Sequence, residues 1–157
     1  WETMTLNSLG HIAFDQDELD SARDYYKQAL RLARQVKDRD GIGTALHNLG
    51  NVYLKQRNYK RAEKYFRQTL RRKQQVGHKA GMAAALGQLG DIATLQKDYT
   101  KAEKYLQQSY DAFTELGDRR SIAKVLNKLS VLAFAQTALI DEMIDSIYEE
   151  LGGTIHE

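Results

Sequence analysis

Apolar residues recur along the chain at spacings of three and four, which is the period of amphipathic helices rather than of strands. In residues 43–82 they form two runs, separated by Gln56-Arg57-Asn58. The pattern predicts helices over 3–15, 19–37, 40–55, 59–76, 80–95, 99–116, 120–136 and 138–151. We therefore predict an all-α fold of about eight helices. The absence of proline, which breaks helix interiors, agrees with this prediction.

Polar residues and glycines mark the predicted helix ends. Glu18, Asn58 and Asp98 recur at the break within each helix pair, where Asn and Asp are good N-caps. Gly77 and Gly117 stand where the second helix of a pair should stop, as a C-terminal glycine does.

The same residues recur every 40 positions. Three sets illustrate the register: Leu9, Leu49 and Leu89; Gly10, Gly50 and Gly90; Ala22, Ala62 and Ala102. A fixed long period is typical of a stacked array, in which each unit buries its apolar face against its neighbours. We predict a single domain over residues 1–157, with repeats at about 3–42, 43–82 and 83–122. A partial fourth repeat at 123–136 and a capping helix at about 138–151 complete it.

The repeated glycine lies inside the first helix of each pair, where glycine costs about 1 kcal/mol relative to alanine. We expect close packing of the second helix against the bare backbone, with the repeated alanines as the small residues opposite. Flexible hinges are the alternative reading.

These residues resemble the tetratricopeptide repeat. Leu49, Gly50, Tyr53, Ala62 and Phe66 reproduce its pattern, and the resemblance covers roughly residues 3–136. The 40-residue period and the missing proline are similar to the long-helix subclass, found in Leu-Gly-Asn repeat proteins, kinesin light chains and bacterial regulators. The resemblance implies a right-handed superhelix of antiparallel helix pairs whose first helices line a concave groove. It also implies a scaffold that binds a peptide or protein segment, with no catalysis and no cofactor.

If the leucines and glycines of each first helix face the second helix, the free stripe of the first helix lines the groove. This reasoning predicts a mixed surface of amides, histidines, one acid, one lysine and apolar rims. Asparagine can both donate and accept hydrogen bonds, so Asn51 is suited to hold a peptide backbone. The predicted groove residues are Asn7, His11, Phe14, Thr44, His47, Asn51, Leu54, Gly87, Asp91, Lys124 and Asn127.

Three other readings of the array stay open. The groove positions could be an ordinary solvated face. The chain could be a self-association module that joins through its terminal helices. It could also be the peptide-sensing domain of a bacterial regulator.

Charge adds a second candidate surface, although the formal net charge is only +2. The helix predicted over 59–76 carries a basic stripe of Lys60, Lys64, Arg67 and Arg71, with Lys73 nearby. This stripe could be a solvated convex face, could meet the acidic last helix of a neighbouring copy, or could attract nucleic acid. We favour the solvated face and do not expect nucleic acid as the partner.

Several classes of function lack sequence support. The four histidines show no metal-ligand spacing, and no nucleotide-binding loop or nucleophile motif is present, so we expect neither an enzyme nor a metal or cofactor site. The sequence contains no cysteine, so nothing indicates an oxidising compartment, and we expect a cytoplasmic protein. No apolar stretch approaches the roughly 20 residues of a membrane helix, so we expect no membrane partner. The sequence starts at Trp1 without an initiator methionine and enters the first repeat almost at once, so we expect a segment of a longer regulatory protein.

Overall fold

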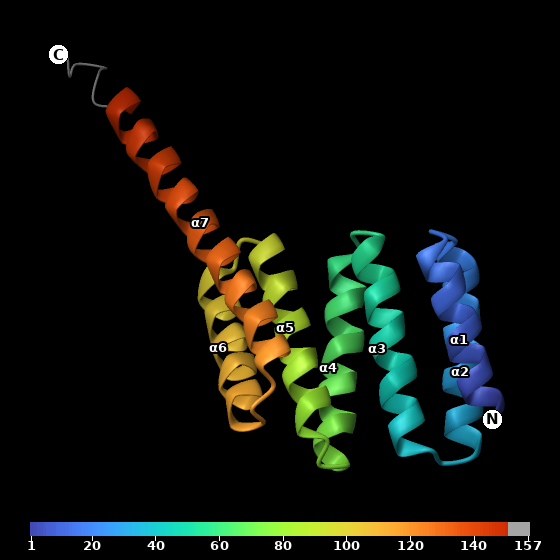
Figure 1. Cartoon of the computed structure of the whole chain (residues 1–157). Coiled ribbons are helices and arrows are strands. Elements are labelled where there is room, and N and C mark those ends of the chain that lie inside the picture. The colour runs from blue at the N-terminus through green and yellow to red at the C-terminus, as the bar shows by residue number, and fades with distance from the viewer. Residues whose placement is uncertain (151–157) are drawn as a thin grey trace.

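The computed structural model describes the backbone of residues 1–150 and the side chains of residues 1–149. This part consists of seven helices and contains no strand, which confirms the predicted all-α repeat. Figure 1 shows the helices stacked side by side, with α1 and α2 at one end of the stack and α7 at the other. The helices are α1 (Glu2–Asp15), α2 (Leu19–Gln35), α3 (Arg39–Lys55), α4 (Tyr59–Gln75), α5 (Lys79–Leu95), α6 (Tyr99–Glu115) and α7 (Arg119–Glu150).

Side-chain caps fix the starts of most helices. The carboxamide or carboxylate oxygens of Asn58 and Asp98 accept the backbone N–H three residues on, both at 3.2 Å, as predicted. Asp38, His78 and Asp118 cap α3, α5 and α7 in the same way. The predicted cap at Glu18 is different, because its longer side chain makes no capping hydrogen bond.

The turns after the first six helices each contain one residue in the left-handed conformation. Gly77 and Gly117 both have φ of 67°, which confirms their role in ending α4 and α6. The register-equivalent position in the first repeat is Lys37, with φ of 56°. A side chain is strained in this conformation, and glycine is not.

Replacing Lys37 with glycine should therefore stabilise the protein by about 0.5–1 kcal/mol, since it removes that strain. The measurement is the midpoint of urea unfolding. Lys27→Gly, in the interior of α2, is the control and should destabilise by a similar amount. A Lys37→Gly protein that is less stable than wild type would contradict this explanation of the turn.

The repeated glycines serve a purpose different in detail from the one predicted. Close packing is confirmed, because a Cβ on Gly50 would lie 2.8 Å from the ring of Phe66, and one on Gly90 would lie 2.6 Å from Leu106. A large apolar side chain therefore lies against each glycine, and the prediction did not include it. Glycine leaves room for that side chain, and the repeated alanines Ala22, Ala62 and Ala102 are themselves fully buried.

Lys73 does not belong to the solvated basic stripe. Its side chain is buried, pairs with Asp40, and lies beside Gly43 and Gly81. A Cβ on Gly81 would lie 2.8 Å from the Lys73 Cδ, so this glycine leaves space for the lysine stem. The hydrogen bond from Lys73, aided by its charge, in turn lowers the pKa of the Asp40 carboxyl. Lys73 therefore links α4 to α3 through its ion pair and to α5 through its stem.

The separate capping helix predicted from residue 138 is instead the second half of α7, which gives seven helices rather than about eight. The earlier turns need a left-handed residue followed by a cap, such as Arg57 and Asn58. The equivalents here are Thr137, whose β-branched side chain disfavours that conformation, and Ala138, which cannot cap. The chain therefore continues as a helix. The predicted last position of the capping helix, residue 151, lies outside the described residues.

Helix α7 is also, by length and composition alone, one helix that could cross a membrane. This differs from the prediction that no apolar stretch is long enough, because the fused helix joins two shorter apolar segments. Val125 and Leu132, in its first half, are almost fully buried in the core formed with α5 and α6. The packing of these residues explains part of the apolar composition.

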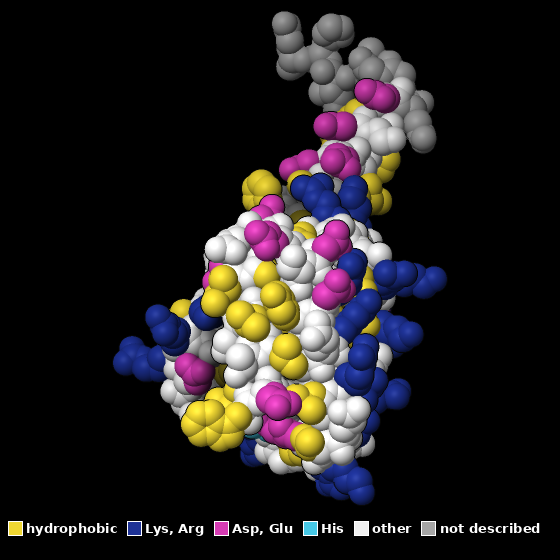
Figure 2. All heavy atoms as spheres, turned by 90° about the vertical axis from the view of Figure 1, so that its right-hand side faces the viewer, with side chains coloured by type: hydrophobic (Ala, Val, Ile, Leu, Met, Phe, Trp, Pro, Cys, Tyr) yellow, Lys and Arg dark blue, Asp and Glu magenta, His cyan; other side chains and the backbone are white. Residues whose placement is uncertain are grey.

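The first repeat leaves apolar residues exposed that later repeats bury. Leu49 and Val52 are 0% exposed, whereas the register-equivalent Leu9 and Ile12 are 39% and 55% exposed. The difference arises because α2 covers α3, while no helix of the described residues covers the corresponding side of α1. Figure 2, which views this end of the stack, shows the resulting hydrophobic patch.

Candidate functional site: the first-helix face

A cleft of about 560 Å³ lies on the face presented by the first helices of the repeats, here named the first-helix face. It is lined by side chains of α3, α5 and α7, with Arg57 of the turn after α3 and Tyr59 at the start of α4. Three of the predicted groove residues line it, namely Leu54, Asp91 and Asn127. The lining is mixed, with apolar side chains, amide and hydroxyl groups and three cations. The complete set is Leu54, Lys55, Arg57, Tyr59, Asp91, Thr94, Leu95, Asn127, Lys128 and Val131.

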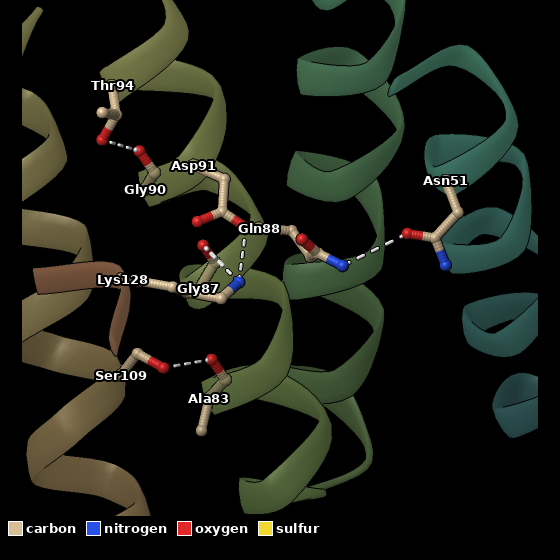
Figure 3. Close-up of polar contacts among 9 residues, drawn as sticks. All are labelled: Asn51, Ala83, Gly87, Gln88, Gly90, Asp91, Thr94, Ser109 and Lys128. Atoms are coloured by element: carbon tan, nitrogen blue, oxygen red, sulfur yellow. Dashed lines mark hydrogen bonds and ion pairs between the residues drawn. The ribbon is translucent and has the colours of Figure 1, made fainter. Parts of the chain in front are cut away.

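A second, smaller cleft of about 200 Å³ lies among α3, α5, α6 and α7. Three more predicted residues line it, namely His47, Gly87 and Lys124. The missing side chain of Gly87 contributes to this hollow, and a Cβ there would lie 3.3 Å from the Ser109 hydroxyl. That hydroxyl donates a 2.8 Å hydrogen bond to the carbonyl oxygen of Ala83 (Figure 3), so the floor of the cleft is fixed.

Polar contacts connect each first helix to the next one. The side-chain amide of Asn48 donates to the Asn7 Oδ1 at 3.2 Å, and that of Gln88 donates to the Asn51 Oδ1 at the same distance. The Lys128 ammonium donates to the Asp91 carboxylate. Figure 3 shows the second and third of these contacts side by side. We name the three contacts the polar ladder.

The donors of the polar ladder are not among the groove residues predicted from the sequence. Asn48, Gln88 and Lys128 are separated by the 40-residue period, so the register contained a signal for them. The signal is weak because the residue type at this position differs from repeat to repeat. Their contacts show that Asn51 and Asp91 have structural partners, which the predicted peptide-binding role did not include.

Asp91 is the acidic group at the centre of the first-helix face. Burial raises the pKa of its carboxyl, and the nearby Lys128 charge acts in the opposite direction. Lys128 also lies 3.4 Å from the carbonyl oxygen of Gly87. The pair places opposite charges between the two clefts, where either could contact a polar group of a bound chain.

The remaining predicted groove residues do not line either cleft. The His11 ring packs edge-on against Tyr26 with centroids 5.7 Å apart, and Thr44 donates to the backbone of its own helix. The Lys55 ammonium lies 4.8 Å from the centre of the Phe14 ring, a cation–π contact between the first two repeats. Asn7, His11 and Phe14 lie on α1, Thr44 lies near the start of α3, and Asn51 lies in the second half of α3.

His47 is held in its neutral form. Its ring packs edge-on against Phe66, with centroids 5.4 Å apart, and is partly buried. Burial, followed by the positive charges of Lys73, His11 and Lys128, lowers the pKa of His47 to about 4. At neutral pH the ring therefore offers one donor and one acceptor to the smaller cleft.

No group of three or more His, Asp or Glu side chains in the described part of the chain could hold a metal ion. The first-helix face instead offers shape, amide groups and a few charges. A stack of helix pairs with such a face defines an α-helical repeat protein with a candidate interaction surface.

Two tetratricopeptide repeat profiles match the chain, one over residues 2–75 and the other over residues 47–115. The chain belongs to the tetratricopeptide repeat family. Repeats of this family are generally protein-interaction modules and are typically non-enzymatic scaffolds. A sequence comparison with curated proteins gave no match.

Solved structures share the fold at low sequence identity. BtubC (BKLC) from P. vanneervenii is 19% identical with a TM-score of 0.77, and the match covers 99% of this chain and 66% of that one. The apo form of RapI is 16% identical with a TM-score of 0.79, covering 96% and 54%. The TPR domain of Arabidopsis FLU is 24% identical with a TM-score of 0.69, covering 73% and 96%. The chain thus spans only part of the first two proteins.

Proposed function

We propose that the chain is a scaffold that binds a peptide or protein segment on the first-helix face, as a module of a larger regulatory protein. The observation that carries this proposal is the 560 Å³ cleft, which brings together side chains from three successive repeats. A preformed surface of this kind reduces the ordering cost that falls on the complex.

The lining of the larger cleft suggests which segment would fit. Leu54, Leu95 and Val131 offer an apolar area, and Leu95 and Val131 are 54% and 55% exposed. Asn127 is an exposed amide that can donate to and accept from a peptide backbone. Arg57 adds positive charge at the rim, whereas Lys55 already pairs with Asp17 at 2.8 Å. A segment with an apolar side chain next to an acidic residue would satisfy these groups.

Peptides selected from a displayed random library against the wild-type domain provide the ligand for a test. The double substitution Asn127→Ala/Val131→Ala should weaken their binding at least about tenfold, because it removes both an amide and an apolar contact. Fluorescence anisotropy with a labelled peptide measures the dissociation constant.

The matched control is Lys104→Ala/Gln108→Ala on α6, where both side chains are exposed at the same i, i+4 spacing. It should leave affinity within about twofold of wild type. Peptides that bind both double variants as tightly as wild type would contradict the assignment of the cleft.

A further inference from the structure

Charge is strongly segregated along this chain of small net charge. Residues 27–79 hold 15 of the 23 Lys and Arg residues but only 3 of the 21 Asp and Glu residues. Residues 129–157 hold no Lys or Arg and six Asp or Glu residues. Figure 2 shows many of the cations along one edge of the molecule and several acids on the projecting end of α7, with other acids on the body. Two surfaces of opposite charge therefore lie on different parts of the fold.

The positive surface contains a cleft between the second helices α2 and α4, of about 750 Å³, here named the basic cleft. Its cations come from both helices, and Leu30, Tyr53 and Tyr65 provide apolar lining between them. The complete set is Lys27, Leu30, Arg31, Arg34, Gln35, Tyr53, Arg61, Lys64, Tyr65 and Gln68. A second hollow of about 610 Å³ continues along α4 and contains the predicted basic stripe.

Most cations of the basic cleft have no acidic partner of their own. Within residues 1–149, Lys27, Arg31, Arg34 and Lys64 make no salt bridge. On the neighbouring stripe, Arg67 pairs with Glu63. The basic cleft thus offers several cations to an acidic ligand without first breaking internal ion pairs.

The aromatic residues of the cleft favour a protein ligand over nucleic acid. The Tyr53 and Tyr65 rings are stacked, with centroids 5.3 Å apart and an interplanar angle of 11°. Arg61 lies 5.4 Å from the centre of the Tyr53 ring, and Tyr53 is only 5% exposed, so this ring offers no free face to a ligand. Single-stranded nucleic acid gains much of its affinity from bases stacked on free aromatic faces, which Tyr53 does not offer.

The second half of α7 has the complementary composition. Asp141, Ile144, Asp145 and Tyr148 are spaced i, i+3, i+4 and i+7, so they form one mixed acidic and apolar stripe. All four are exposed, with Ile144 at 43% and Tyr148 at 48%. In Figure 1 this half of the helix projects from the body, at the end of the stack opposite α1 and α2. We name these four residues the α7 stripe.

We propose that the basic cleft of one copy of the chain binds the α7 stripe of a second copy. Ile144 and Tyr148 would lie against the apolar lining, while Asp141 and Asp145 would pair with cations of the two walls. The projection of α7 away from α2 and α4 makes the contact intermolecular. It joins two different surfaces, so it is heterologous and produces chains or closed rings of copies. Neither surface includes a residue of the two clefts on the first-helix face.

The first test is the mass of the full chain by sedimentation equilibrium. At about 50 mM salt the average mass should rise as the concentration increases from about 10 to about 500 μM, and the rise should be smaller at about 500 mM salt, where surface charges are screened. A protein that stays monomeric throughout the low-salt series would overturn the proposal.

Charge reversal on each surface separates the two halves of the contact. Arg31→Glu/Lys64→Glu changes the basic cleft, and Asp141→Lys/Asp145→Lys changes the α7 stripe. Each variant alone should associate at least about tenfold more weakly than wild type, because the charge complementarity of the contact is lost. All of these side chains are exposed, so helix content by circular dichroism should be unchanged.

Mixing the two variants gives the decisive result. The stripe variant still has a normal cleft, and the cleft variant still has a normal stripe, so the mixture can form the wild-type contact between the two variants. The reversed cleft and the reversed stripe carry opposite introduced charges, so they can also pair with each other. We expect the average mass of the mixture to rise above that of either variant alone. A mixture that stays monomeric, although wild type associates, would overturn the proposed pairing.

The matched control is Lys97→Glu/Lys104→Glu, which makes the same change of charge at exposed positions outside both surfaces. It should associate as wild type does, and loss of association in it would show that only overall charge matters. Purified protein should also be checked for bound nucleic acid by its ultraviolet absorbance. If nuclease treatment abolishes association, nucleic acid bridges the copies and the proposal fails.

Discussion

Replacing Gly50 with leucine is expected to lower the free energy of unfolding by about 3 kcal/mol, the upper part of the usual range for overpacked cores. A Cβ alone would lie 2.8 Å from the Phe66 ring, which is itself fully buried. A leucine side chain cannot fit without moving α4 away from α3. The melting temperature should fall by roughly 10 °C, measured by circular dichroism.

A matched pair of smaller substitutions isolates the steric cause. Gly50→Ala and Gly87→Ala both gain about 1 kcal/mol of helix propensity, but only the first places a Cβ against a buried ring. We expect Gly50→Ala to destabilise the protein, while Gly87→Ala stays close to wild type. Equal stability of the two variants would show that the space beside Gly50 is not needed by Phe66.

Acidification from about pH 6.5 to pH 4 is expected to cost the folded state about 2–3 kcal/mol through His47 alone. The folded pKa of about 4 lies below the value of 6.5 that applies in the unfolded chain, so the unfolded state binds the extra proton in this window. The contribution of neutral His47 to stability is complete above pH 6.5. It is lost as the pH falls toward 4.

The measurement is urea unfolding at a series of pH values for wild type and His47→Gln. The difference in stability between the two proteins should shrink as the pH falls, because glutamine does not titrate. His11→Gln, which removes the exposed histidine of the equivalent edge contact with Tyr26, is the control. A constant difference between wild type and His47→Gln across this range would contradict a depressed pKa for His47.

The 40-residue register was sufficient to predict the repeat architecture, because burial follows position within the repeat. Leu49 and Leu89, for example, are both almost fully buried. The partner of each glycine was not predictable in the same way. Whether Gly50 faces Ala62 or Phe66 depends on how far one helix slides along the other, and the spacing along the chain does not determine that distance.

The first-helix face was predicted in part. Leu54, Asp91 and Asn127 line one cleft, and His47, Gly87 and Lys124 line the other. The sequence could not show that α7 continues past residue 136, because apolar periodicity on both sides of Thr137 is the same whether or not the helix bends. It also could not show that the walls of the basic cleft come from two helices about 30 residues apart along the chain.

The polar ladder has a consequence for the shape of the molecule. Each of its contacts spans two adjacent first helices, so each one sets how closely a repeat tilts toward its neighbour on that side. Two are neutral amide pairs and the third is an ion pair, so within the ladder the contact between α5 and α7 is the one that salt or a charged ligand should weaken. Asp91 and Lys128 both line the larger cleft, so a charged ligand bound there would change the inclination of α7 toward α5.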